Sequence, residues 1–204
     1  MRILKVDSKN PDLAVLRTAA EEIMKGGLIA YPTDTLYGLA TDLFSEEAVR
    51  RLFSAKRRSL GKGLPILVEN FSVVERIAYV NRIAVKLAER FWPGALTMVL
   101  DKRECIPDTV TGGGSVAVRM PACPAALRLA GLCGGLLIGT SANISGSSRM
   151  PDTASVVVEE LGAVIDLILD GGRTGGAPST IIDVRGDFIK VIREGVIPAR
   201  VLSF

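Results

Sequence analysis

Residues 134–146, with the sequence GGLLIGTSANISG, join an apolar run to a polar one. The run Leu136–Ile138 is typical of a buried strand. The residues that follow, Gly139–Gly146, carry no charge but contain three hydroxyls, the amide of Asn143 and a glycine at each end. A plain surface turn rarely needs so many hydrogen-bonding side chains. A strand that ends in such a loop indicates an α/β domain, in which ligands bind beyond the carboxyl ends of strands.

Strand-like and helix-like runs alternate on both sides of this stretch. The predicted strands are Arg2–Val6, Leu28–Tyr31, Leu64–Val68, Leu96–Leu100, Val116–Arg119, Leu136–Thr140, Leu167–Asp170, Thr180–Val184 and Phe188–Arg193. The predicted helices are one capped by Asn10 with Pro11 at its first position, Glu46–Lys56, one capped by Ser72, Asn81–Phe91, Pro124–Leu132 and one from Thr153 to about Leu161. This interleaving predicts an α/β fold of mixed topology, and no linker or repeat divides residues 1–204, so we expect a single domain.

The composition excludes several classes of function. Hydrophobic residues make up 48% and charged residues 23% of the 204 residues, as in an ordinary globular protein. The net charge of +3 is too small to indicate nucleic-acid binding by itself. The chain has no histidine, which excludes Ser-His-Asp and Cys-His mechanisms and histidine metal sites. Its three cysteines form no CxxC pair, so neither a disulfide framework nor a metal site is predicted.

The N-terminal residues, MRILKVDSKNP, lack the apolar core of a signal peptide. No apolar run approaches the ~20 residues that a bilayer-spanning helix needs. We therefore expect a cytoplasmic protein without membrane contact.

A basic segment, KRRSLGK at residues 56–62, places four cations in seven residues at a predicted helix end. Cations at a helix C-terminus favour the helix dipole, and such a segment is commonly a solvated surface. Alternatively, it clamps a polyphosphate, because Arg offers a fork of donors and Lys a mobile charge. The pattern alone leaves both interpretations open.

Three further segments carry polar groups at predicted strand ends. Arg119 lies in VAVRMP at residues 116–121, the loop PTDTLYG at residues 32–38 contains Thr35, and Ser179 lies at the start of a strand in GAPSTIIDV. Each is compatible with an ordinary turn or strand edge, and each also suits the rim of a pocket, where a guanidinium binds a carboxylate bidentately. Neither GxxxxGK[ST] nor GxGxxG occurs, so a bound nucleotide would be held by separate loops.

Taken in order, the blocks GGLIAYPTDTLYGL, AKRR…LPILV, FWPGALTMVL, VAVRMP, GTSANISG and STIIDV resemble the threonylcarbamoyl-AMP synthase family, the YrdC-like proteins, over about residues 10–200. The resemblance implies a twisted mixed sheet flanked by helices, with a deep central cavity. It also implies a nucleotidyltransferase that makes threonylcarbamoyl-AMP and pyrophosphate from L-threonine, bicarbonate and ATP. A downstream complex would then transfer the threonylcarbamoyl group to tRNA.

The resemblance also implies the site residues. Those implied around L-threonine are Thr35, Arg119, Ser141 and Ser179. Those implied around ATP are Arg58, Lys62, Ser115, Asn143 and Arg193. Lys56 and Arg58 match the family's Lys-x-Arg element and are the implied catalytic pair. Mg²⁺ is expected to arrive with ATP and not to occupy a site of its own on the protein.

The sequence departs from the family pattern at several positions. Leu67 stands where some members have a histidine, and Ser59 and Gly63 stand where proline is common, which predicts a looser basic loop. The segment Ser147–Asp152 is about a residue longer than usual, and its nucleotide contact is left unassigned. The chain resembles the short version of the family, which has no further domain after a position equivalent to Phe204.

Two alternative functions remain open. A related domain transfers a carbamoyl group from carbamoyl phosphate and needs the same adenylated intermediate. A non-catalytic module that binds double-stranded RNA or tRNA fits the basic segment weakly, but aromatic residues are only 5% of the chain. Binding of RNA that depends on phosphate contacts would weaken steeply with salt.

Overall fold

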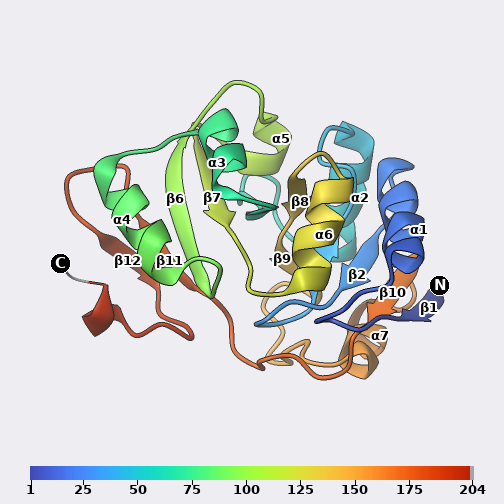
Figure 1. The fold of residues 1–204 in the computed structure, drawn as a ribbon. Helices are drawn as coiled ribbons and strands as arrows, with labels where there is room; N and C mark the ends of the chain where they lie inside the picture. The colour runs from blue at the N-terminus through green and yellow to red at the C-terminus, as the bar shows by residue number, and fades with distance from the viewer. Residues whose placement is uncertain (203–204) are drawn as a thin grey trace.

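The computed structural model describes residues 1–202 and contains two mixed β-sheets flanked by helices (Figure 1). The five-stranded sheet has the order β1 (Arg2–Lys5), β10 (Leu167–Asp170), β2 (Ile29–Tyr31), β3 (Gly38–Ala40) and β9 (Thr140–Ser141). The seven-stranded sheet has the order β12 (Lys190–Arg193), β11 (Thr180–Asp183), β6 (Leu96–Lys102), β7 (Ser115–Arg119), β4 (Ile66–Val68) and β8 (Leu136–Ile138), with β5 (Ala78–Tyr79) paired to β6. The predicted α/β class with mixed topology is confirmed, and the strands divide between two sheets.

One edge of the seven-stranded sheet collects polar residues because of its strand directions. β7 runs antiparallel to β6 and parallel to β4, and β11 runs parallel to β6. The end of β7 at Arg119 therefore lies beside the starts of β6 and β11. Ser179 immediately precedes β11, and β12 returns antiparallel to it and ends at Arg193. Three of the residues assigned to substrates thus lie at the same edge.

The chain passes directly from one sheet to the other at Gly139. The predicted strand Leu136–Thr140 is therefore wrong in one respect, because it is two strands, β8 and β9, in different sheets. The Gly139 amide donates to the Pro65 carbonyl over 2.7 Å, and a Cβ at this position would lie 2.8 Å from Leu67 Cγ. Only glycine fits such a close approach, so the break is set by packing between distant segments.

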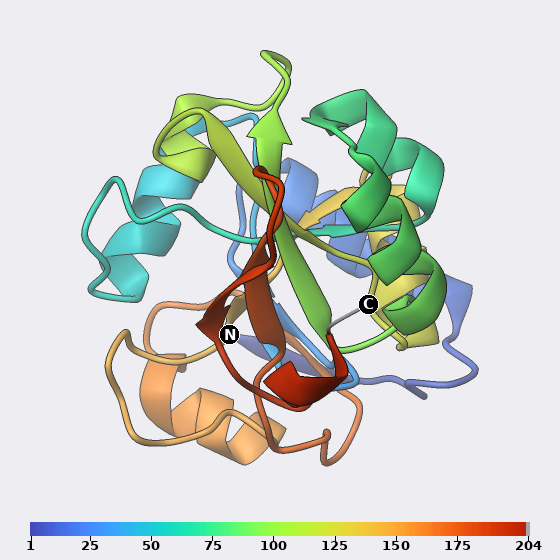
Figure 2. The same ribbon diagram turned by 90° about the vertical axis from the view of Figure 1, so that its left-hand side faces the viewer.

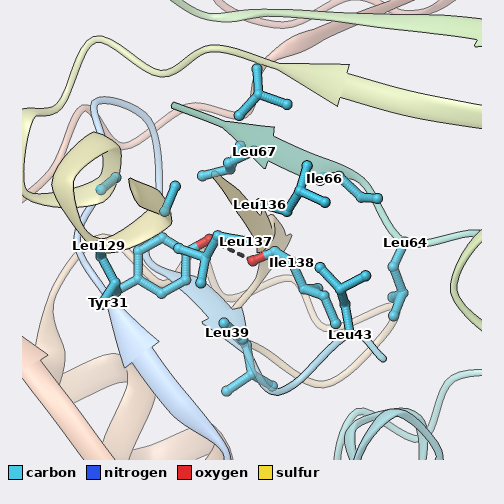
Figure 3. Packing of buried hydrophobic residues seen from close by; sticks show 14 of the residues in the cluster. Tyr31, Leu39, Leu43, Leu64, Ile66, Leu67, Leu129, Leu136, Leu137 and Ile138 are labelled. Atoms are coloured by element: carbon cyan, nitrogen blue, oxygen red, sulfur yellow. Dashed lines mark hydrogen bonds between the residues drawn. The ribbon is translucent and has the colours of Figure 1, made fainter. Parts of the chain in front are cut away.

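Tyr31 connects the two sheets through the core. Its hydroxyl donates to the Ile138 carbonyl over 2.6 Å, and its ring lies among buried aliphatic side chains that include Leu39, Leu129 and Leu137 (Figure 3). Burial raises the pKa of this hydroxyl far above its usual range. The phenol is therefore a neutral donor that ties β2 to β8.

The helices cover the outer faces of the sheets. They are α1 (Leu13–Met24), α2 (Glu46–Ala55), α3 (Phe71–Ile77), α4 (Arg82–Phe91), α5 (Asp108–Thr111), α6 (Pro124–Leu132), α7 (Ala154–Leu161) and the 3₁₀ turn η1 (Ala199–Val201). α1 packs on β2 and β10, α6 packs on β4 and β8, and the two helices contact each other. Figure 2 shows α3 and α4 on one side of the seven-stranded sheet and α2 and α5 on the other. α7 packs on β10 of the five-stranded sheet.

Two predicted helix caps are wrong. Asp12, not Asn10, caps α1, because the Asp7 carboxylate accepts hydrogen bonds from the Lys9 and Asn10 amides and folds those residues into a turn. Asn70 caps α3 in place of Ser72, whose hydroxyl instead donates to the Asn70 side chain.

The short strands β3 and β5 were not predicted from the sequence. Their two or three residues are too few to show a period. Within residues 1–202, no helix has the length and apolar character needed to cross a membrane.

Candidate functional site

Arg119 is the centre of a buried polar cluster. Its side chain is 5% exposed, and its guanidinium donates from Nε to the Gly94 carbonyl over 2.8 Å, from Nη1 to Thr35 Oγ1 over 2.7 Å and from Nη2 to Asp34 Oδ1 over 2.6 Å. Thr35 is held in turn by the hydroxyl of Thr33 at 3.0 Å. Of the five N–H groups of a guanidinium, two therefore have no partner within residues 1–202.

Ser179 extends this cluster along the sheet edge. Its hydroxyl lies 2.9 Å from that of Thr97, and both side chains are buried. Its carbonyl accepts a 2.8 Å hydrogen bond from Arg193 Nη2. Partial burial and then the nearby Arg119 guanidinium lower the pKa of Arg193. Arg193, assigned to ATP, therefore lies next to residues assigned to threonine.

Lys56 binds the backbone of the polar loop Gly139–Gly146. It is 2% exposed, and its ammonium donates to the carbonyl of Ser141 and, over 2.7 Å, to that of Asn143. Its own carbonyl accepts from the Ser145 amide over 2.8 Å. The loop is closed on itself by a 2.6 Å hydrogen bond from Ser141 Oγ to Asn143 Oδ1.

Lys56 titrates close to neutrality. Burial, and to a smaller extent the nearby Arg58, lower its pKa from the ordinary 10.5 to about 7, although Glu160 acts in the opposite direction. A buried ammonium that donates to backbone carbonyls is occupied by the protein itself. The catalytic assignment implied that Lys56 contacts a triphosphate directly. In the structure, its ammonium instead binds the carbonyls of Ser141 and Asn143.

Arg58 organises the basic loop. Its Nε donates to the Lys62 carbonyl over 3.1 Å and its Nη2 to the Gly63 carbonyl over 2.8 Å. A Cβ at Gly63 would lie 2.4 Å from the Thr111 carbonyl oxygen, so this position packs closely against the end of α5. These contacts tie the loop down despite Ser59 and Gly63.

The assigned residues form three groups. Lys62 lies on the loop that contacts residues 111–112, three to four residues before Ser115. Ser115 begins β7 and Arg119 ends it, which separates them by about 13 Å at the usual rise of a strand. Lys56, Ser141 and Asn143 form a unit of their own, joined to the five-stranded sheet because Ser141 pairs with Gly38.

Leu67 and the segment Ser147–Asp152 have structural contacts. Leu67 is buried, pairs with Arg119 in the sheet register and fills the space beside Gly139. The Pro151 carbonyl accepts from the Tyr37 amide, and the Asp152 carbonyl accepts from the Thr174 amide, both over 2.8 Å.

A surface groove of about 500 Å³ lies on α2 and α7. It is lined by Leu28, Arg51, Ser54, Ala55, Arg57, Ile144, Glu160, Leu161, Ala163 and Val164. None of the assigned residues lines this groove, and the deep central cavity stays a prediction. In the described part of the chain, no three His, Cys, Asp or Glu side chains gather as metal ligands.

Sequence reasoning missed two residues of the site, Thr97 and Glu160, and the pairing of Asp34 with Arg119. Asp34 pairs with Arg119, Thr97 pairs with Ser179, and Glu160 accepts hydrogen bonds from the polar loop. Asp34 lies inside a segment that the sequence had singled out, and Thr97 is a hydroxyl within an apolar strand. Nothing in the sequence distinguishes Glu160 from the neighbouring Glu159.

Known proteins resemble this chain in sequence. The family model Sua5_yciO_yrdC, described as "Telomere recombination", matches residues 21–195. Threonylcarbamoyl-AMP synthase of Pyrococcus abyssi is 42% identical over 186 residues, which are 90% of this chain and 54% of that protein. Putative threonylcarbamoyl-AMP synthase of Methanocaldococcus jannaschii is 37% identical over 205 residues, 99% of this chain and 97% of that protein.

A solved structure extends the likeness to three dimensions. The crystal structure of P. abyssi Sua5 complexed with L-threonine has a TM-score of 0.93 at 40% identity and covers 99% of this chain and 60% of that one. The chain thus spans little more than half of the P. abyssi protein and nearly all of the M. jannaschii one. Because the family model covers most of its sequence and a solved relative shares its fold, the chain belongs to the Sua5/YciO/YrdC family.

Proposed function

We propose that the protein is an L-threonylcarbamoyladenylate synthase, which makes threonylcarbamoyl-AMP and pyrophosphate from L-threonine, bicarbonate and ATP. The observation that carries the proposal is the buried Arg119 with two unpaired N–H groups, in a fold shared with a relative crystallised with L-threonine. The names of the P. abyssi and M. jannaschii relatives support the same activity.

The Arg119 cluster suits the amino-acid substrate. A guanidinium binds a carboxylate through two parallel N–H bonds, and Asp34 and Gly94 fix its orientation in advance. The hydroxyls of Thr35 and Ser179 lie at this edge and offer partners to the ammonium and hydroxyl of threonine. A site that buries a partner for the substrate hydroxyl discriminates strongly against valine, whereas the methyl group distinguishes threonine from serine by only about 1–3 kcal/mol.

The reaction needs no protein nucleophile. The threonine amine attacks the bicarbonate carbon and water leaves, which gives a carbamate. A carbamate oxygen then attacks the α-phosphorus of ATP, the bond from that phosphorus to the bridging oxygen breaks, and pyrophosphate leaves. Carbamate and triphosphate are both anions, so the task of the protein is to position them and to offset their repulsion. A chain without histidine can do both.

Arg58, Lys62 and Arg193 supply the positive charge for the triphosphate, and Ser115 and Asn143 supply neutral hydrogen-bonding groups. Lys56 contributes by holding the carbonyls of the polar loop, so that the loop faces both ligands. The cations of the basic loop suit phosphate oxygens and not a metal ion, so Mg²⁺ enters on the nucleotide and supplies charge neutralisation there.

The product points to a partner. A mixed anhydride of a carbamate and AMP is reactive, so an acceptor must receive the threonylcarbamoyl group soon after it forms. We assign that role to a downstream transfer complex acting on tRNA, with at most weak RNA contact by this chain itself, and we place the reaction in the cytoplasm.

Pyrophosphate release from ATP, with L-threonine, bicarbonate and Mg²⁺ omitted in turn, tests the proposal. Release that requires all three supports adenylate formation. Release that ignores threonine but responds to carbamoyl phosphate would assign the chain to carbamoyl transfer instead. No release, together with tight and salt-sensitive RNA binding, would favour the RNA-binding alternative.

A further inference from the structure

Glu160 on α7 contacts the polar loop and the residue that follows it. Its Oε2 accepts a 3.1 Å hydrogen bond from the Ile144 amide, and its Oε1 accepts a 2.9 Å hydrogen bond from Ser147 Oγ. The carboxylate therefore bridges the second half of the loop and the residue that follows Gly146. Both of its oxygens are used.

The hydrogen bonds of Glu160 alternate along the loop with those of Lys56. Lys56 binds the carbonyls of Ser141 and Asn143 and the amide of Ser145, whereas Glu160 binds the amide of Ile144. Lys56 directly follows α2 and Glu160 lies on α7, far away in the sequence. Positions 141, 143, 144 and 145 of the loop are thus fixed from two separate parts of the chain.

Glu160 has no role that requires contact with substrate. It lines the groove on α2 and α7 with Ile144, and none of the assigned residues lines that groove. A carboxylate close to a triphosphate would oppose its binding by charge repulsion. We therefore expect it to act on the reaction through the loop that it holds, to which Lys56, whose pKa Glu160 raises, also binds.

We propose that Glu160 is a positioning residue, whose carboxylate fixes Ile144 and Ser147 so that Ser141 and Asn143 stay oriented toward threonine and ATP. This inference rests on the proposed function. A carboxylate suits the task because it offers two charged acceptors, one to a backbone N–H and one to a hydroxyl. Glutamine preserves the geometry, since its oxygen can accept from Ile144 and its amide can donate to Ser147 Oγ.

Two readouts test the proposal on the full chain with the variants Glu160→Ala, Glu160→Gln and Ser147→Ala. The first is amide hydrogen exchange of residues 140–147 in the substrate-free protein. The second is the KM for threonine and for ATP in pyrophosphate release, measured against kcat. Glu159→Ala is the matched control, because Glu159 lies on the same helix and, among residues 1–202, forms its ion pair with the side chain of Arg149, both side chains being more than half exposed.

We expect Glu160→Ala to speed exchange at Ile144 and to raise at least one KM by about tenfold, the scale of a lost hydrogen bond to a charged group. Ser147→Ala should show a smaller effect, and Glu160→Gln and Glu159→Ala should stay within about threefold of wild type. Unchanged loop exchange in Glu160→Ala overturns the proposal. So does faster exchange with unchanged KM values, or failure of glutamine to rescue. Wild-type protein without threonine-dependent release would count against the proposed function, while loop exchange would still show whether Glu160 holds the loop.

Discussion

Arg119 Nη1 donates a 2.7 Å hydrogen bond to Thr35 Oγ1 across 84 residues of sequence. Thr35 follows β2 of the five-stranded sheet, and Arg119 ends β7 of the seven-stranded sheet. The bond therefore joins the two sheets at the place where the amino-acid substrate is proposed to bind. Any change to either residue alters both the site and the contact between the sheets.

Replacement of Arg119 by alanine should raise the KM for threonine by about 10–100-fold, because a charge-assisted hydrogen bond contributes about 1.5–3 kcal/mol. Arg119→Lys should recover little of this loss, since an ammonium cannot form the bidentate pair. Steady-state kinetics over a threonine series measures the effect. Arg17→Ala, a change of the same size on the exposed surface of α1, is the control. A threonine dependence that does not move would reject the carboxylate role of Arg119.

In the basic loop, Arg58→Ala and Lys62→Ala should weaken the use of ATP, with the larger effect in Arg58→Ala. Arg58 both carries charge and holds the carbonyls of Lys62 and Gly63, whereas Lys62 contributes charge alone. Arg57→Ala is the matched control, because its side chain lines the groove on α2 and α7. ATP titrations of pyrophosphate release compare the three variants. Equal loss in all three would mean that only the total charge of the loop matters.

The buried Lys56 predicts a pH dependence of stability. Its pKa is about 7 in the folded protein and near the ordinary 10.5 once unfolded, so between these values the unfolded chain binds the additional proton. The contribution of Lys56 to the free energy of unfolding should therefore increase as the pH rises, by up to about 1.4 kcal/mol per pH unit. Arg58 and Glu160 are the charged groups that act on it.

Urea unfolding of wild type and Lys56→Met between pH 7 and 9 isolates this contribution. As the pH rises, the free energy of unfolding of the wild type should increase relative to that of Lys56→Met. A constant difference would show that Lys56 keeps an ordinary pKa in the folded state.

Gly38→Ala should destabilise the fold by about 1–3 kcal/mol, the usual cost of overpacking a core. A Cβ at this position would lie 2.4 Å from Tyr31 Cζ, and the Tyr31 ring is fixed by its bond to Ile138. Gly186→Ala is the control, because its Cβ would meet nothing within 4 Å. Thermal or urea unfolding measures both. Equal stability of the two variants would mean that Tyr31 moves aside at little cost.

The sequence predicts those features that depend on neighbouring residues. The helix Pro124–Leu132 and the strand Leu167–Asp170 have the predicted bounds, because proline, apolar spacing and β-branched runs act locally. The break at Gly139 was not predicted because it depends on packing against Leu67. The ion pair of Arg119 with Asp34 was not predicted because the two residues are 85 positions apart in the sequence. The contacts of Lys56 with the loop carbonyls could not be predicted from neighbouring residues either. A lysine is usually exposed, so its burial is recognised only when the residues that surround it in space are known.

The single residue between β8 and β9 has a consequence for how the molecule unfolds. In chain order, β1–β3 belong to the five-stranded sheet and β4–β8 to the seven-stranded one. After Gly139, β9 and β10 again belong to the five-stranded sheet, and β11 and β12 belong to the seven-stranded sheet. No cut in the backbone separates the two sheets into fragments that each keep their own strands. Thermal melting should therefore be one cooperative event, in which the proposed substrate site is lost together with the scaffold.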